Sequence, residues 1–510
     1  MTWHVARPNQ AISLDSLPLQ PHETLFELTA EAVQTDARVL AWFGRLVGNH
    51  VELLVVLTGT EPGTLHLARA LLPDRYASLT PRIPALHAFE RELAEQFGVV
   101  AEGHPGLHPL RFHRTYRSGH DAWHRRDDVQ PLVGVMDFQR VEGDGIHEVA
   151  VGPVHAGVIE PGHFRFQCHG ELVWRLEIAL GYQHRGVEKA LVNLPLHRAV
   201  HQVETLAGDT TIGHATAHAQ AIEALAGLHV SERAQMVRAV ALELERLAAH
   251  TGDLGALAGD VGYLPTLSWC SALKGDWLGM TALLCGSRFG RSLVRPGGVC
   301  FDLDPQRRQQ LRERLEQVWP QVQEATDFLW TTPSILGRFE AVGTVPTDVA
   351  RAIGLVGMAA RASGLPRDIR AEFPQPGTPA WPVKVQETGD VEARARVRWE
   401  DMQRSVHQIQ RLLDLPGDPD PTATTQRLLP PKTPLILEKN SLSVALVEGW
   451  RGEIVHVAVT DGTGKLDRYK VVDPSFHNWT GLAMALRGQQ ISDFPLCNKS
   501  FNLSYCGHDL

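Results

Sequence analysis

The chain has 510 residues, of which 43% are hydrophobic and 21% charged, so it can bury a large core and is long enough for two or more domains. Its formal net charge of -9 is spread over segments of mixed sign, which excludes the basic stripe that proteins use to bind nucleic acid. No apolar run approaches the roughly 18 residues of a membrane helix, and the first residues do not resemble a signal peptide. The six cysteines form no CxxC pair, which favours reduced thiols and a cytoplasmic location.

The N-terminal part of the chain predicts a small domain of mixed helix and strand. Residues 38–43 and 51–58 are rich in Val, Leu and aromatic residues and are separated by a Gly-Asn pair, which predicts a β-hairpin. Apolar residues at helical spacing predict a helix at 65–72 and another at 88–97. The polar and charged stretch 116–128 then marks the linker to the next domain.

The remainder of the chain predicts a mainly helical domain with small β units, so the expected fold class is α+β. We place the boundary between a small α/β domain at 1–130, linker included, and a larger domain at 131–510. The clearest helix is 231–251, where Ser231 can cap the N-terminus and apolar residues recur at helical spacing. An Asp-Pro pair at 304–305 begins another long helix.

The C-terminal part of the chain predicts a loop and then a small β unit. Prolines and glycines recur through 413–434 and deny this stretch regular hydrogen bonding, so we predict a loop there. Residues 452–459 and 469–472 have strand composition, and the turn formers at 461–464 lie between them.

Seven short segments resemble one superfamily, and they follow its order. The first resembles the signature of the small hydrophilic subunit of complex I. The others resemble the large subunit shared by complex I and the group 4 membrane-bound nickel-iron hydrogenases, and the fusion of the two is similar to formate-hydrogenlyase and hydrogenase-4 large subunits. The segments are 89–105, 152–157, 181–189, 232–235, 361–370, 389–390 and 451–453.

The resemblance implies a nickel-iron centre only if four cysteine thiolates are present, since soft sulfur ligands hold these metals. The residues at the four ligand positions are Ala207, Thr210, Ser504 and Gly507, and none of them is a cysteine. Cys506 lies one residue out of register and cannot rebuild the site alone. We therefore expect no metal on this chain. We also expect no maturation cleavage, with Leu510 remaining the last residue.

The other chemistry of the superfamily, quinone reduction, has lost its two signature residues as well. The resemblance calls for a histidine and a tyrosine at positions that hold Ile159 and Gly208 here. What remains around the former centre is a shell of polar residues: His155, Glu160, His163, Arg165, His184, Arg185, Glu188, Asp209 and His214.

From this shell we predict candidate roles. His184, Glu188, Asp209 and His155 are candidates for proton handling, because histidines near neutral pH beside carboxylates can relay protons. The resemblance implies that Arg185 and His214 lie near a partner's iron-sulfur cluster or the cleft. A satisfied polar network inherited from the fold is the competing interpretation, and we prefer it for His155, His163 and Glu160. For the 184–188 segment we prefer a function at the interface.

The resemblance thus predicts an electron-transfer subunit of a membrane-associated, complex I-like oxidoreductase. Its expected partners are an iron-sulfur subunit and integral membrane subunits, which would hold it on the cytoplasmic face of the membrane. The cluster belongs to the partner, quinone is the candidate acceptor, and this chain binds no cofactor of its own. NAD is not expected here, because no Gly-rich turn joins a strand to a helix with a downstream acidic residue. A non-catalytic scaffold in the same complex is the alternative.

We predict that the purified complex contains no stoichiometric nickel and evolves no hydrogen, because the four ligand positions supply no thiolate. Elemental analysis and hydrogen evolution measured on anaerobically prepared complex check this. One nickel per chain would overturn the prediction.

Overall fold

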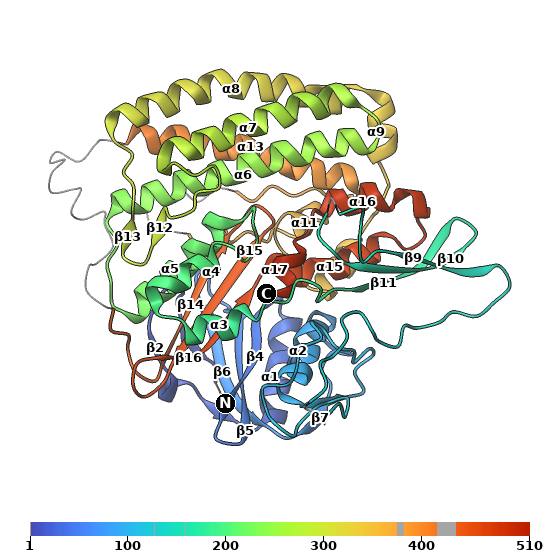
Figure 1. The fold of residues 1–510 in the computed structure, drawn as a ribbon, viewed down its shortest axis with the longest axis vertical. Helices are drawn as coiled ribbons and strands as arrows, with labels where there is room; N and C mark the ends of the chain where they lie inside the picture. The colour runs from blue at the N-terminus through green and yellow to red at the C-terminus, as the bar shows by residue number, and fades with distance from the viewer. Residues whose placement is uncertain (1, 127, 158, 375–381, 416–434) are drawn as a thin grey trace.

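The computed structural model describes residues 2–126, 128–157, 159–374, 382–415 and 435–510. Within these ranges, a stack of long helices covers one side of a central C-terminal sheet, and the N-terminal part of the chain lies on the other side (Figure 1). Most of the predicted loop at 413–434 lies outside the described residues.

A five-stranded sheet forms the core of the N-terminal part. Four strands follow the order β1-β6-β5-β4 with antiparallel neighbours, and β3 pairs in parallel with β6. The predicted hairpin is confirmed as β4 and β5, and Gly48 in its turn has a φ of 60°, which glycine adopts at little cost. Helices α1 and α2 pack on this sheet. The bounds are β1 (His4–Ala6), β3 (Leu19–Gln20), β4 (Val39–Val47), β5 (His50–Thr58), β6 (Leu65–Leu72), α1 (His22–Gln34) and α2 (His87–Phe97), with β7 (Arg75–Ala77) and β8 (Val100–Glu102) as a separate parallel pair.

The helix predicted at 65–72 is wrong, because this segment is strand β6. It pairs with β5 along its whole length and with β1 and β3 on its other edge. Six of its eight side chains are buried, and six of its eight residues are Leu or Ala. In such a short run, helical spacing and a strand buried on both faces give the same pattern.

The second sheet joins the two ends of the chain. Its order is β16-β15-β14-β2, and Ile12 near the N-terminus pairs with Leu442. The two strands predicted around the turn at 461–464 are confirmed as β15 and β16, which pair in antiparallel. The bounds are β2 (Ile12–Ser13), β14 (Ser441–Glu448), β15 (Glu453–Thr460) and β16 (Leu466–Val472).

Four long helices form the stack: α6 (Glu232–Asp260), α7 (Leu264–Cys285), α8 (Pro305–Thr331) and α13 (Val391–Asp414) (Figure 1). The predicted helix starts are confirmed, since the Ser231 hydroxyl accepts from the N–H of Ala234 and the Asp304 carboxylate from that of Arg307. Helix α6 approaches α7 closely at Gly255, where an added Cβ would lie 2.6 Å from the Cβ of Cys270.

Shorter elements surround the second sheet. A three-stranded sheet of order β11-β10-β9 extends beside α15 (Figure 1). Its strands are β9 (Ile146–Val151), β10 (His163–His169) and β11 (Leu172–Ala179), and a separate antiparallel pair consists of β12 (Val294–Arg295) and β13 (Gly298–Val299). The helices are α3 (Val187–Asn193), α4 (Leu196–Val203), α5 (Thr211–Leu225), α9 (Pro333–Phe339), α10 (Thr347–Ala352), α11 (Gly357–Ala362), α12 (Ile369–Glu372), α15 (Pro474–Ala485), α16 (Phe494–Phe501) and α17 (Tyr505–Asp509). Three 3-10 turns are η1 (Leu14–Ser16), η2 (Pro84–Leu86) and η3 (Ile491–Asp493).

Lys470 of β16 lies at the centre of a buried ion network between the N-terminal part and the second sheet. Its Nζ is 2.6 and 2.7 Å from the carboxylate oxygens of Glu92 on α2, and 3.1 Å from Glu188 on α3. Arg111 also binds Glu92, and Arg468 lies 3.2 Å from Glu188. Burial opposes ionisation of Glu188, but the surrounding cations outweigh it and lower its pKa to about 2.

We predict that Lys470→Met lowers the free energy of unfolding by about 3 to 5 kcal/mol at pH 7, because it leaves buried carboxylates short of a partner. Because its pKa is lowered, the ionised Glu188 carboxylate stabilises the fold above pH 4.5, its ordinary pKa. This stabilisation is lost as the pH falls from 4.5 to about 2. The difference from the parent protein should therefore shrink over that range. Denaturant titration measures the free energy of unfolding of both proteins. Lys465→Met is the control, because Lys465 lies on an exposed turn. Equal stability of the two variants would contradict the prediction.

Candidate functional site

The residues at the four positions that would carry nickel-iron ligands serve instead at helix starts and in close packing. Thr210 and Ser504 are the residues that precede α5 and α17, and the Ser504 hydroxyl accepts from the N–H of Gly507 at 2.9 Å. At Gly507 an added Cβ would lie 2.7 Å from the carboxyl carbon of Asp473, so a cysteine would collide with this carboxylate. Ala207 is buried and apolar. The residues present do not fit a nickel-iron centre.

Arg451 connects the two segments that would flank such a centre. Its guanidinium donates to both carboxylate oxygens of Asp209, at 2.7 and 2.8 Å, and to the Thr210 hydroxyl at 3.2 Å. Its Nε donates to the carbonyl of Asn502 at 2.6 Å, and the guanidinium carbon lies 3.8 Å from the ring centroid of Trp450. A bidentate pair of this kind is among the stronger ion pairs in proteins. We call these contacts the Arg451 bridge.

The bridge fixes the charge of Asp209. About half of the Asp209 side chain is exposed to solvent. Desolvation of the carboxyl group opposes its ionisation, but the Arg451 guanidinium outweighs this desolvation and lowers the pKa of Asp209. The nearby thiol behaves in the opposite way. Burial and the neighbouring Glu160 raise the pKa of Cys506 to about 12, so it stays a neutral thiol and is not a thiolate ligand.

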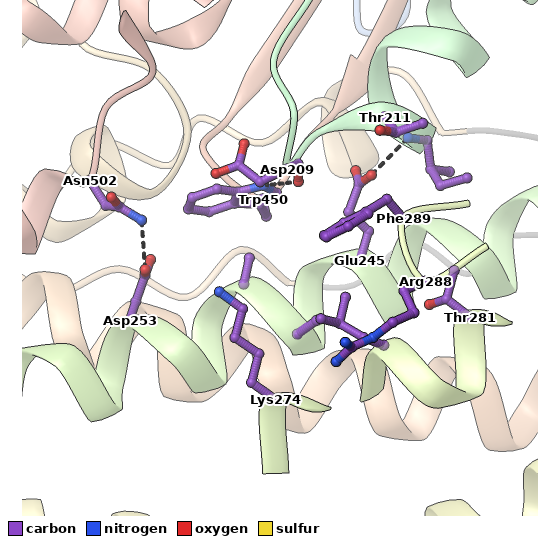
Figure 2. A pocket seen from close by; sticks show the side chains of 14 residues that line it. Asp209, Thr211, Glu245, Asp253, Lys274, Thr281, Arg288, Phe289, Trp450 and Asn502 are labelled. Atoms are coloured by element: carbon purple, nitrogen blue, oxygen red, sulfur yellow. Dashed lines mark hydrogen bonds between the residues drawn. The ribbon is translucent and has the colours of Figure 1, made fainter. Parts of the chain in front are cut away.

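A cavity of about 70 Å³ lies between the Arg451 bridge and helices α6 and α7 (Figure 2). Asp209 and Trp450 form one wall, Glu245 and Asp253 on α6 another, and Lys274 reaches in from α7. Arg288, Phe289 and Asn502 complete the part of the lining that carries the polar and aromatic groups.

The cavity carries two cations without a described anionic partner. Among the residues that the structure describes, Lys274 and Arg288 make no hydrogen bond or ion pair. The carboxyl groups that α6 contributes to the lining are engaged: Asp253 binds Arg398 at 3.0 Å and Asn502 at 2.6 Å. Glu245 accepts from the N–H groups of Ile212 and Gly213 at the start of α5, and burial raises its pKa to about 8.

The candidate site residues predicted from the sequence lie in several different places, and only some of them are near the cavity. Asp209 lines the cavity, and His214 lies buried behind it, 3.0 Å from Asp473. Glu188 belongs instead to the Lys470 network, and His155 bonds to the carbonyl of Gly162 at 2.8 Å. Neither of these two lines the cavity, and their role in proton handling stays a prediction.

His184 and Arg185 lie on a separate face next to the C-terminal residues. The Nδ1 of His184 is 2.8 Å from the carbonyl of Asp509, and its ring stacks on His113. Burial, and then His113, lower the pKa of His184. The exposed Arg185 donates to the carbonyls of Thr205 and Leu206 at 2.7 and 2.9 Å, directly before the first ligand position.

Sequence reasoning missed Lys274, Arg288, Glu245 and Trp450. None of them belongs to a motif, and only the meeting of α6, α7 and the turn after β14 brings them together. The one available signal was Trp450, which directly precedes the recognised Arg-Gly-Glu segment.

Comparison with known proteins identifies the family to which this chain belongs. Residues 260–509 match the family "Respiratory-chain NADH dehydrogenase, 49 Kd subunit", and residues 19–129 match "Respiratory-chain NADH dehydrogenase, 30 Kd subunit". Over 452 residues the chain is 31% identical to formate hydrogenlyase subunit 5 of Escherichia coli (strain K12), which covers 84% of this chain and 76% of that protein. The chain belongs to the family of complex I 49-kDa subunits and membrane-bound hydrogenase large subunits.

Other members of this family agree with that assignment. The chain is 30% identical over 371 residues to NADH-quinone oxidoreductase subunit 4 of Thermus thermophilus, covering 67% of this chain and 89% of that protein. A solved structure of the membrane-bound sulfane sulfur reductase, an archaeal respiratory membrane complex, has the same fold, with a TM-score of 0.65, 24% identity and coverage of 72% and 99%.

The predicted family, the fused arrangement and the mixed fold class are therefore confirmed, and the chain is a subunit of a complex I-like oxidoreductase. In the described ranges, no helix is both long enough and apolar enough to cross a bilayer.

Proposed function

We propose that this subunit passes electrons from an iron-sulfur cluster in a partner to a small acceptor in the cavity beside the Arg451 bridge. The observation that carries the proposal is the pair of cations, Lys274 and Arg288, in a cavity whose lining includes Asp209 and Thr211, the two neighbours of the former ligand position Thr210. Cations placed before reaction stabilise the negative charge that an acceptor gains on reduction. Integral membrane partners would hold the subunit at the cytoplasmic face of the membrane.

Quinone is the acceptor class that the proposal names, and a relative carries it in its name. A quinone takes up two electrons and two protons to become a quinol, and the electrons come from the partner's cluster. The cavity is about 70 Å³, whereas a cavity of about 150 Å³ encloses benzene. It therefore accepts the polar edge of the ring, with the rest of the headgroup at its mouth.

The residues of the cavity take distinct roles in this proposal. Lys274 and Arg288 bind the carbonyl edge. Glu245 keeps a proton at neutral pH, because burial raises its pKa to about 8, and it lines the cavity as a candidate proton donor. Asp209 is held ionised by Arg451, so it positions the bridge and does not release a proton.

We predict that Lys274→Met and Arg288→Met each lower kcat/KM for a water-soluble quinone by roughly 10- to 100-fold, the cost of about one charged hydrogen bond. Quinone reduction by the purified complex, with the partner's cluster reduced beforehand, is the measurement. Arg291→Met, on an exposed residue of the same loop, is the control and should react like the parent complex. Unchanged kinetics in both cavity variants would sink the proposed site.

A scaffold without redox chemistry is the second candidate, and the filled ligand positions favour it. Gly507 against Asp473 and the Arg451 bridge replace the metal by ordinary packing and ion pairing. On this hypothesis the parent complex assembles but does not reduce quinone. The same assay on the parent complex therefore separates the two functions.

We also predict that Arg185→Met lowers the reduction potential of the nearest partner cluster while the complex still assembles. The exposed face of Arg185 beside the Thr205 carbonyl suits an interface, and a cation close to a cluster favours its reduced state. Redox titration followed by electron paramagnetic resonance measures the potential. Arg198→Met on α4 is an exposed control. An unchanged potential in the Arg185 variant would make this arginine purely structural.

A further inference from the structure

Five buried side chains form one hydrogen-bonded series behind the former metal centre. Asp473 Oδ2 is 3.0 Å from His214 Nε2, and His214 Nδ1 is 3.1 Å from His456 Nε2. His456 Nδ1 is 2.9 Å from the Tyr469 hydroxyl, which is 2.8 Å from His218 Nδ1. Each of these residues is at most 1% exposed.

Secondary structure explains why the five side chains meet. His214 and His218 are four residues apart on α5 and so lie on one face of that helix. Helix α5 packs on β14 and β15. His456 on β15 and Tyr469 on β16 come from adjacent strands, and Asp473 directly follows β16. The contacts therefore rest on regular elements and not on loops.

With neutral histidine rings and an ionised Asp473, one arrangement of protons satisfies every link in the series. Burial, helped by the neighbouring His214 and His218, lowers the pKa of His456 well below its ordinary range, and burial with Arg295 lowers that of His218 to about 4, so both rings are neutral. Burial opposes ionisation of Asp473, but His214 and Arg451 outweigh it and lower its pKa.

An ionised Asp473 accepts, so a neutral His214 ring donates through Nε2 and accepts at Nδ1. His456 then donates through Nε2 and accepts the Tyr469 O–H at Nδ1. Tyr469 accepts in turn from Nδ1–H of His218. Every donor points towards Asp473, and His218 Nε2 is left with a free lone pair.

The two ends of the series differ. Asp473 lies against Gly507 at the former ligand position, and the Arg451 charge acts on it. At the other end, His218 Nε2 is buried and has no hydrogen-bond partner among the described residues. The charge that acts on His218 is that of Arg295, which Glu204 binds at 2.6 Å. A buried acceptor without a partner is unusual and calls for an explanation.

We propose that Asp473, His214, His456, Tyr469 and His218 form a proton relay that carries a proton from His218 to Asp473, which packs against the former ligand position Gly507. A proton bound at His218 Nε2 releases the one on Nδ1 to Tyr469. Tyr469 passes its proton to His456, His456 to His214, and His214 to Asp473. One proton is gained at His218 and one at Asp473 becomes available, and no electron moves within the relay. The use of that proton by a reduced acceptor rests on the proposed function.

The proton arrangement is tested first on the purified full-length chain, independently of any reaction. Nitrogen-15 NMR of labelled histidines should find His218 protonated at Nδ1, and His214 and His456 protonated at Nε2. Assignments come from single substitutions of the three histidines. A different tautomer in any of the three rings breaks the one-way order of donors and overturns the relay.

Transport is then tested in the complex with Tyr469→Phe and His218→Asn. The first removes the hydroxyl between two rings. The second keeps a donor to Tyr469 but has no basic nitrogen to receive a proton, so it serves even if the first fails to fold. We expect quinone reduction at least tenfold slower in either variant, with a changed solvent deuterium isotope effect and an unchanged rate of cluster reduction.

Tyr76→Phe is the matched control, since Tyr76 is a buried tyrosine of the N-terminal part outside the relay. It should react like the parent complex. Parent-like rates in Tyr469→Phe or His218→Asn overturn the relay while leaving the proposed function intact. If the parent complex reduces no quinone, the proposed function fails and the tautomer measurement alone decides whether the relay is built as inferred.

Discussion

The buried contact of Lys470 with Glu92 and Glu188 is the constraint on which the rest of the structure depends. It brings a helix of the N-terminal part and a helix of the large part to one cation on β16, an edge strand of the second sheet. Buried charges are costly when a partner is missing, so neither part can shift without exposing an unpaired ion. The same strand, β16, carries Tyr469 and leads directly to Asp473, and the network therefore also fixes one side of the candidate site.

At the candidate site, an arginine connects two segments that a metal ion would otherwise hold together. In a metal centre, one ion would hold the loop before α5 and the C-terminal segment together. Here Arg451 spans the same two segments through Asp209 and Asn502. An arginine supplies direction through its planar donors and keeps its charge at every physiological pH, but it cannot change oxidation state. In the proposed function electrons are therefore stored elsewhere in the complex, and this chain contributes binding and proton handling.

The features that could be predicted from the sequence are those that short stretches of residues determine. The hairpin, the two long helices capped by Ser231 and Asp304, and the loss of four thiolates were all readable, because each depends on neighbouring residues or on a fixed motif. The segment 65–72 was misread because a strand buried on both faces has no alternation to detect. Lys274 and Arg288 acquire their meaning only from three-dimensional convergence. His456 and Tyr469 look like ordinary strand residues until α5 is placed over them.

The pairing of β2 with β14 has a consequence for biosynthesis. Ile12 pairs with Leu442, a partner 430 positions further along the chain. At a synthesis rate of about 5–20 residues per second, the first strand waits roughly 20 to 90 seconds for its neighbour. During that interval an unpaired strand edge is open to wrong partners. Only two residues make this strand, which limits the edge that a nascent chain offers to other proteins.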